Sequence, residues 1–163
     1  KHDNICILED DWVLDSNKDI SLKVLEGSCI ALDNNIFDFI RFRHNIAPGS
    51  PLYTIQYQGK EHESWEHLLD AVHWWHSSLA VKFPDKIHSL NIKNTDFVYG
   101  DSYYCNHTNN PFICSTKFYL DNIAPYSGAG NALEGQIREP WRKAGYRVAH
   151  NIPGLFTHHR LDR

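Results

Sequence analysis

The feature that most constrains this chain is a short apolar run that ends in three consecutive acidic residues. Residues 4–8 read N-I-C-I-L, and Glu9, Asp10 and Asp11 follow directly. A short apolar run bounded by polar residues is typical of a buried β-strand. Because ligands of open α/β sheets bind just beyond the carboxyl ends of strands, the three carboxylates are expected at a ligand-binding position.

Such an acidic triplet predicts a divalent-metal site. Neighbouring carboxylates repel one another, and a site that holds them close together usually needs a cation. Mn²⁺ and Mg²⁺ prefer oxygen ligands and keep coordination positions open for phosphate oxygens. A solvated acidic turn is the alternative that the residues alone leave open.

The composition is that of an ordinary globular protein. The chain has 163 residues, of which 42% are hydrophobic and 22% are charged, and this length favours a single domain over residues 1–163. The net charge of -4 argues against a nucleic-acid-binding module, which usually carries a basic patch. No apolar run of about 18 residues occurs, so no membrane span is expected. The cysteine pattern leaves the compartment open between the cytoplasm and the ER or Golgi lumen.

Strand-like and helix-like segments alternate along the rest of the chain, which favours an α/β layered domain. The strongest helix is expected at residues 61–81, where apolar residues recur at helical spacing. Residues 82–110 are polar and irregular in pattern, apart from one expected strand near residues 97–99. Strands are further expected at residues 36–43, 52–58, 146–150 and 155–157, a helical or mixed segment at 20–32, a helical turn at 116–120, and a helix at 134–144 that Pro140 interrupts.

A second group of polar residues lies near the other end of the chain. Residues 134–158 read E-G-Q-I-R-E-P-W-R-K-A-G-Y-R-V-A-H-N-I-P-G-L-F-T-H. In this stretch Glu134 opens the expected helix, a G-Y-R-V-A strand follows, and a G-x-x-x-H pattern ends at His158. A carboxylate at a helix start can serve as a general base for a hydroxyl nucleophile, and it can equally serve in a capping box.

Together the two ends resemble the GT-A-type glycosyltransferases, in the L-E-D-D form found in the lipopolysaccharide-modifying and collagen-modifying families. The resemblance spans most of the chain in order, with its specific motifs at the two ends. It implies a GT-A-like, Rossmann-like α/β fold with a mixed sheet flanked by helices. It also implies a metal-dependent enzyme that moves a sugar from a nucleotide-sugar donor to a glycan or other hydroxyl acceptor, with inversion at the sugar.

The resemblance assigns the metal and the base position by position. Asp11, the last carboxylate of the acidic motif, is the expected ligand of Mn²⁺ or Mg²⁺. His158 is the expected second metal ligand, and its neighbour His159 competes for the role because the doublet leaves the register open by one residue. Glu134 is the expected general base, which takes the proton of the acceptor hydroxyl.

The resemblance also implies residues that contact the donor. Glu9 and Asp10 are expected to support the metal, the ribose or the donor sugar. Asn110 and Pro111 open an N-P-x-hydrophobic segment that is expected to line the donor pocket. Arg41 and Arg43 alternate out of an aromatic strand and are expected either at exposed positions or against phosphate.

The histidine-rich helix at residues 61–81 does not match a zinc protease. That chemistry needs two histidines four residues apart on one helix face, with a glutamate directly after the first. His62 and His67 are five residues apart, which separates them by roughly 140° around a helix. Trp74 and Trp75 of the same helix are expected to contact the acceptor, since aromatic faces suit sugar stacking.

Two further functions remain open at this point, a noncatalytic carbohydrate-binding module of the same fold and a metal-dependent phosphoester hydrolase. In GT-A-type enzymes a nucleotide-binding half precedes the acidic motif, whereas eight residues precede Glu9 in this sequence. We therefore expect part of that N-terminal half to be missing from the sequence or to come from another chain.

Overall fold

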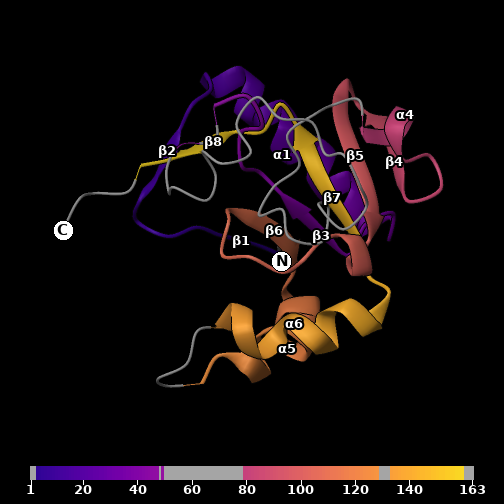
Figure 1. Cartoon of the computed structure of the whole chain (residues 1–163). Coiled ribbons are helices and arrows are strands. Elements are labelled where there is room, and N and C mark those ends of the chain that lie inside the picture. The colour runs from indigo at the N-terminus through magenta and orange to yellow at the C-terminus, as the bar shows by residue number, and fades with distance from the viewer. Residues whose placement is uncertain (1–2, 48, 50–78, 129–132, 160–163) are drawn as a thin grey trace.

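A computed structural model describes residues 3–47, 49, 79–128 and 133–159 of the chain. These residues form a six-stranded mixed sheet, a separate two-stranded sheet, and helices that flank the larger sheet (Figure 1). The α/β class with a mixed sheet flanked by helices is thereby confirmed. Within the described residues, no helix has the length and apolar character to cross a membrane.

The larger sheet has the strand order β1-β6-β3-β7-β5-β4. Its strands are β1 (Asn4–Ile7), β3 (Phe39–Arg41), β4 (Ile87–Ile92), β5 (Thr95–Asp101), β6 (Phe112–Ser115) and β7 (Arg147–Ile152). Strands β3 and β7 pair in parallel, and the other neighbouring strands pair antiparallel. It follows that β1, β3, β4 and β7 run in the same direction, so their carboxyl ends lie at one end of the sheet.

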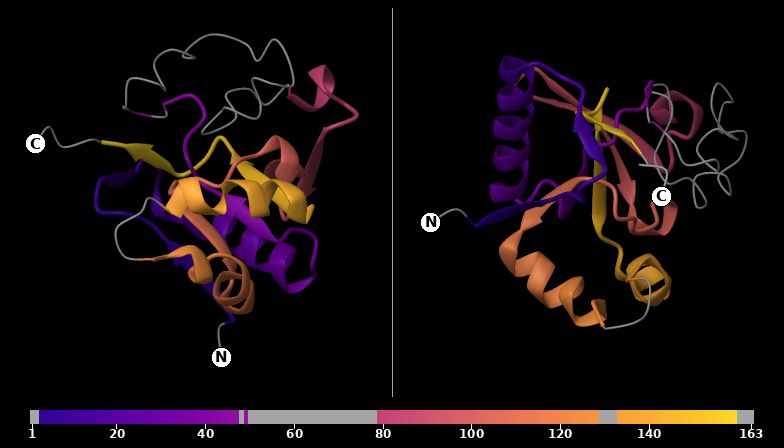
Figure 2. Two further views of the ribbon diagram at one scale, coloured as in Figure 1. Left: turned by 60° about the horizontal axis from the view of Figure 1, so that its bottom comes forward. Right: turned by 90° about the vertical axis from the view of Figure 1, so that its left-hand side faces the viewer.

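The helices cover both faces of this sheet, and each face has its own apolar core. Strand side chains alternate between the two cores, so that Phe39 packs with Trp141 of α6 whereas Ile40 packs with the apolar residues of α1. Figure 1 places α5 and α6 below the strands and α1 behind them, and the right-hand view of Figure 2 shows α1 as a layer of its own. The helices are α1 (Lys18–Asp33), α4 (Leu79–Lys82), α5 (Thr116–Asn122) and α6 (Leu133–Ala144), with short 3-10 turns η1 (Ser102–Tyr104) and η2 (Ala124–Tyr126).

Local capping explains where the helices begin and end. The Asn17 side chain accepts a hydrogen bond of 3.0 Å from the Ile20 backbone N–H at the start of α1, so the segment expected as helical or mixed is a helix. Ser115 caps α5 in the same way. Helix α6 runs through Pro140 as one element and ends before Gly145, whose φ of 69° is the left-handed conformation that glycine adopts readily.

Two expectations for the strands need correction. Strand β1 is half-buried rather than buried, because it is the last strand of the described sheet on its side. Residues 82–110 are not irregular, because β4 and β5 form a hairpin whose turn residues Lys93 and Asn94 have φ of 52° and 60°. The strand expected at residues 52–58, and most of the helix expected at residues 61–81, lie outside the described residues.

A two-stranded sheet joins the two ends of the chain. Strand β2 (Trp12–Leu14) follows the acidic triplet and pairs antiparallel with β8 (Phe156–His158), and Trp12 lies opposite His158. The turn before β8 holds it against the end of β3, since the Leu155 backbone N–H donates to the Phe42 carbonyl at 2.7 Å. The sheet therefore brings residues beyond β1 and residues beyond β7 to the same place.

Gly154 allows this close approach and provides a test of it. Its φ is 95°, and an added Cβ would lie 2.3 Å from the Arg43 carbonyl oxygen. We expect Gly154→Ala to lower the free energy of unfolding by about 2 kcal/mol or more, through backbone strain and this clash. Urea unfolding followed by circular dichroism measures the change.

Gly135→Ala is the matched control for this substitution. Gly135 lies in α6, and an added Cβ there would meet nothing within 4 Å. Alanine should raise the free energy of unfolding by about 0.5–1 kcal/mol, because it restricts the unfolded chain and favours the helix. Equal effects of the two substitutions would contradict the tight placement of β8 against β3.

Candidate functional site

The structure brings Asp11 and His158 into direct contact. His158 Nε2 lies 3.0 Å from Asp11 Oδ2, although 147 positions separate the two residues in sequence. The pairing of β2 with β8 produces this contact, and the His159 backbone N–H donates to the Asp11 carbonyl at 2.8 Å. Of the two neighbouring histidines, His158 is the one whose ring contacts Asp11.

The second carboxylate oxygen of Asp11 has an unusual environment. Asp11 Oδ1 is buried and accepts no hydrogen bond, whereas Oδ2 contacts His158. A buried polar atom without a partner costs free energy, and most such atoms in proteins have one. Carboxylate and imidazole are both groups that bind divalent metals, and a cation at Oδ1 would give this oxygen a partner.

Glu9 interacts electrostatically with the other acidic residues of the two motifs. Burial is the first cause that raises the pKa of the Glu9 carboxyl above its usual value, and the nearby carboxylates of Asp11 and Glu134 raise it further. His158 acts in the opposite direction, and Asp10 adds a smaller raising effect. Acidic side chains from the start of the chain and from α6 thus lie close enough to act on one another, as expected of groups that meet at one site.

Glu134 lies at the start of α6, and its side chain is held by the backbone directly before Asn110. Its Oε1 accepts a hydrogen bond of 2.6 Å from the Asn109 backbone N–H, while the residue as a whole stays exposed. Asn131, the residue that would complete a capping box with Glu134, lies outside the described residues. The observed bond fixes the direction of the carboxylate and leaves it accessible to a ligand.

Asn110 and Pro111 line the floor of this region rather than its surface. Both residues are buried. The Asn110 side-chain oxygen accepts a hydrogen bond of 3.2 Å from Arg43 Nη1, and the Pro111 carbonyl accepts one of 2.8 Å from the Phe42 backbone N–H. The segment is therefore fixed against the end of β3.

Three residues connect the parts of this region, and of these the sequence suggested only Arg43, either as an exposed residue or as a phosphate contact. Arg43 is 1% exposed, so the exposed position considered for it is wrong, and its guanidinium carbon lies 5.2 Å from the centroid of the Trp12 ring. Trp12 in turn meets the His158 ring edge-on at 4.6 Å between centroids. His150 lies beneath them and makes a 2.6 Å hydrogen bond through Nε2 to the Arg43 carbonyl. Arg41 is also wholly buried.

The number of protein ligands sets which metal chemistry is possible. Among the residues that the structure describes, no group of three or more His, Cys, Asp or Glu side chains has the arrangement of a metal site. Asp11 and His158 are a pair, which does not match the closed four-ligand sites of structural zinc. A metal that binds substrate phosphates commonly takes only one or two carboxylates from the protein and keeps its other positions open.

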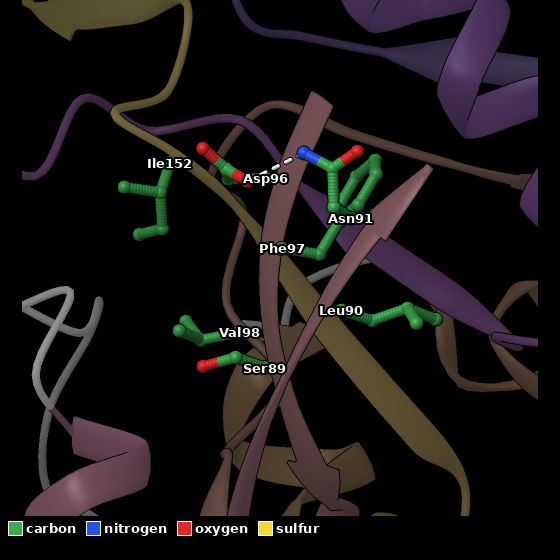
Figure 3. Close-up of a pocket in the computed structure, with 7 residues that line it drawn as sticks. All are labelled: Ser89, Leu90, Asn91, Asp96, Phe97, Val98 and Ile152. Atoms are coloured by element: carbon green, nitrogen blue, oxygen red, sulfur yellow. Dashed lines mark hydrogen bonds between the residues drawn. The ribbon is translucent and has the colours of Figure 1, made fainter. Parts of the chain in front are cut away.

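An open depression of about 280 Å³ lies elsewhere on the molecule, over β4, β5 and the end of β7 (Figure 3). In it, the Asn91 side chain donates a hydrogen bond to Asp96. None of the residues expected at the site lines it, and it lies toward the opposite side of the sheet from β1. Trp74 and Trp75, which were expected to contact the acceptor, lie outside the described residues.

The buried histidines beneath the site predict that stability falls in acid. Burial, and secondarily Arg41, lowers the pKa of His150 to about 3 and that of His107 to about 4. Since an unfolded histidine has a pKa of about 6.5, the unfolded chain binds protons below that pH that the folded chain does not. Each ring should therefore cost about 1.4 kcal/mol of unfolding free energy per pH unit below pH 6.5.

We expect His150→Gln to reduce this pH dependence by about 1.4 kcal/mol between pH 7.5 and pH 5.5. Urea unfolding at the two pH values gives the change in unfolding free energy with pH for each protein. Comparing this change between the variant and the unaltered chain removes any loss of stability that does not depend on pH. His88→Gln is the control, because His88 is exposed on β4. The same pH dependence in His150→Gln as in the unaltered chain would contradict the neutral, buried state of this ring.

Comparison with known proteins adds no relative to this geometry, because no family model, no curated protein and no solved structure matches the chain.

Proposed function

We propose that this chain is a metal-dependent glycosyltransferase with a GT-A-like fold. It would move a sugar from a nucleotide-sugar donor to a glycan or another hydroxyl acceptor. The observation that carries the proposal is the contact of Asp11 with His158, with the carboxylates of Glu9 and Glu134 close by. These are the residues that the acidic motif and the C-terminal motif assign to metal, donor and base.

The metal-binding residues account for the donor side of the reaction. Asp11 and His158 would hold Mn²⁺ or Mg²⁺ through the carboxylate and the imidazole. A bound divalent ion supplies positive charge that stabilises the departing nucleoside diphosphate. Glu9 and Asp10 are exposed beside this pair and can accept hydrogen bonds from ribose or sugar hydroxyls.

Glu134 accounts for the acceptor side. In an inverting transfer the acceptor oxygen forms a bond to the anomeric carbon while the bond from that carbon to the diphosphate breaks. The acceptor proton passes to the Glu134 carboxylate, which is exposed and oriented by its bond to the Asn109 backbone. A positioned base of this kind typically contributes about 10²–10⁴-fold to the rate.

The position of the motif in the sheet agrees with this function. The acidic triplet follows β1 at the end of the sheet where the carboxyl ends of β3 and β7 also lie. Ligands of α/β sheets bind at this end, where loops from several strands converge. The GT-A-like assignment rests on this placement together with the resemblance of the two motifs.

A nucleoside diphosphate should stabilise the chain only when Mn²⁺ is present. A ligand at one hundred times its Kd raises the unfolding free energy by about 2.7 kcal/mol, and each kcal/mol moves the Tm of a domain of this size by about 2–4 °C. Asp11→Asn should abolish the shift, because it removes the charge that holds the metal. Thermal unfolding with a panel of nucleoside diphosphates, with and without a chelator, measures the effect.

Asp121→Asn is the matched control, since Asp121 is an exposed carboxylate on α5 whose partner is Lys117. It should respond to Mn²⁺ and nucleotide as the unaltered chain does. An equal Tm shift with Mn²⁺ in Asp11→Asn and Asp121→Asn would contradict the assignment of Asp11 as a metal ligand. A response to Mn²⁺ without any nucleotide response would support the metal site and would mean that the nucleotide is bound by residues outside this chain. No response to either Mn²⁺ or nucleotide would oppose the transferase.

Glu134→Gln should abolish sugar transfer and leave donor binding intact. Glutamine keeps an oxygen that can accept the Asn109 hydrogen bond, but it cannot take a proton from the acceptor. We expect the rate to fall by about 10²–10⁴-fold, with an unchanged Kd for Mn²⁺ and nucleotide. A transfer assay with the nucleotide sugar that the thermal panel identifies measures the rate.

Glu139→Gln controls for the loss of an acidic residue from α6, because Glu139 is exposed and its Oε1 lies 3.8 Å from Arg142 Nη1. It should transfer sugar at the unaltered rate. If Glu134→Gln also retains full turnover, the Glu134 carboxylate is not the general base. Its role is then to hold the Asn109 backbone against the start of α6.

A further inference from the structure

We propose that Arg43 is a positioning residue that couples Asn110 to the Asp11–His158 pair. Its buried guanidinium group would then orient both the segment that begins at Asn110 and the two proposed metal ligands. The inference rests on the proposed metal site. It adds a residue that reaches neither the metal nor the donor directly and yet sets the affinity for the metal.

Two of the contacts that the Arg43 side chain makes are of different kinds. Nη1 donates a hydrogen bond of 3.2 Å to the Asn110 side-chain oxygen, and the guanidinium carbon lies 5.2 Å from the centroid of the Trp12 ring. Arg43, Asn110 and Trp12 are 1%, 4% and 8% exposed. Burial of this kind strengthens both a charge-assisted hydrogen bond and a cation–π contact.

Trp12 lies between Arg43 and His158 and contacts both side chains. Its ring meets the His158 ring at 4.6 Å with an interplanar angle of 60°, and the two residues are opposite each other in the β2–β8 pairing. The His158 ring is therefore packed on one side by Trp12 and directed on the other by Asp11. Since a metal-binding imidazole must direct a ring nitrogen toward the ion, the residues that fix the orientation of the ring act on affinity.

The backbone of Arg43 is also held by neighbouring strands. Its carbonyl oxygen accepts the 2.6 Å hydrogen bond from His150 Nε2, because a carbonyl can only accept. Arg43 also forms an isolated parallel bridge with Phe156, the first residue of β8. One residue thus contacts β7, β8, the residue after the acidic triplet and the segment before β6.

Arginine is suited to this position for a reason that lysine does not share. The planar guanidinium can stack on an aromatic ring and donate in its own plane at the same time, whereas a lysine ammonium is a compact point charge. Arg43→Lys would keep the charge and lose the combined geometry. The expected consequence is a His158 ring that is less well oriented toward Asp11, rather than an unfolded chain.

The test is a set of Mn²⁺ titrations followed by electron paramagnetic resonance of the free ion, without nucleotide. Residues that orient metal ligands typically contribute about 10–100-fold to metal affinity, so we expect Arg43→Lys to raise the Kd for Mn²⁺ by at least about tenfold. Arg142→Lys is the matched control, because Arg142 also stacks on an aromatic ring, that of Tyr103 at 4.7 Å. The control should leave the Kd unchanged.

A double-mutant cycle separates positioning from general destabilisation. If Arg43 acts through His158, then Arg43→Lys should have little further effect on the Kd in a His158→Gln background. Trp12→Phe should show the same non-additivity, and it tests the same path if Arg43→Lys does not fold. Full additivity for these pairs, or an Arg43→Lys Kd equal to that of Arg142→Lys, would overturn the inference.

The proposed metal site can fail separately. If Asp11→Asn leaves the Mn²⁺ Kd of the chain unchanged, then the metal site is wrong and the inference falls with it. If Asp11→Asn abolishes Mn²⁺ binding while Arg43→Lys has no effect, the metal site stands and the role of Arg43 alone is rejected.

Discussion

The antiparallel pairing of β2 with β8 is the constraint on which the candidate site depends. It joins Trp12 to His158 and places the His158 ring 3.0 Å from Asp11. Only three residues on each strand take part, and such a short ribbon is marginal on its own. Its stability must therefore come from the larger sheet, to which the backbone bonds of Leu155 and Phe156 with Phe42 attach it.

The larger sheet supplies this support through a buried polar layer at one end of β3 and β7. Arg41, Arg43 and His150 are each no more than 1% exposed, in a place where most globular domains put apolar side chains. Buried charges and imidazoles are costly unless other groups satisfy them. Replacing such a buried polar layer with well-packed apolar residues often leaves a protein equally or more stable.

The sequence predicted those features that depend on neighbouring residues. The helical turn expected at residues 116–120 is part of α5, the segment left open as helical or mixed is part of α1, and the acidic triplet follows β1 as expected. The β4–β5 hairpin was missed because β4 is an outer strand of the described sheet with polar residues among its apolar ones. The burial of Arg43 and its stacking on Trp12 could not be foreseen, since both depend on segments that meet only through the β2–β8 pairing. The proximity of Asp11 and His158 was expected from the motifs, whereas the strand pairing that produces it was not.

The most direct measurement is anomalous X-ray diffraction at the manganese edge from crystals of the chain grown with Mn²⁺. The account predicts one strong peak that is coordinated by an Asp11 carboxylate oxygen and by His158 Nε2, with the residue-to-residue contact of 3.0 Å opened to admit the ion. Manganese bound elsewhere, or no manganese while the Asp11–His158 contact persists, would contradict it. In that case the two residues form a structural hydrogen bond, and the metal-dependent transferase loses its central support.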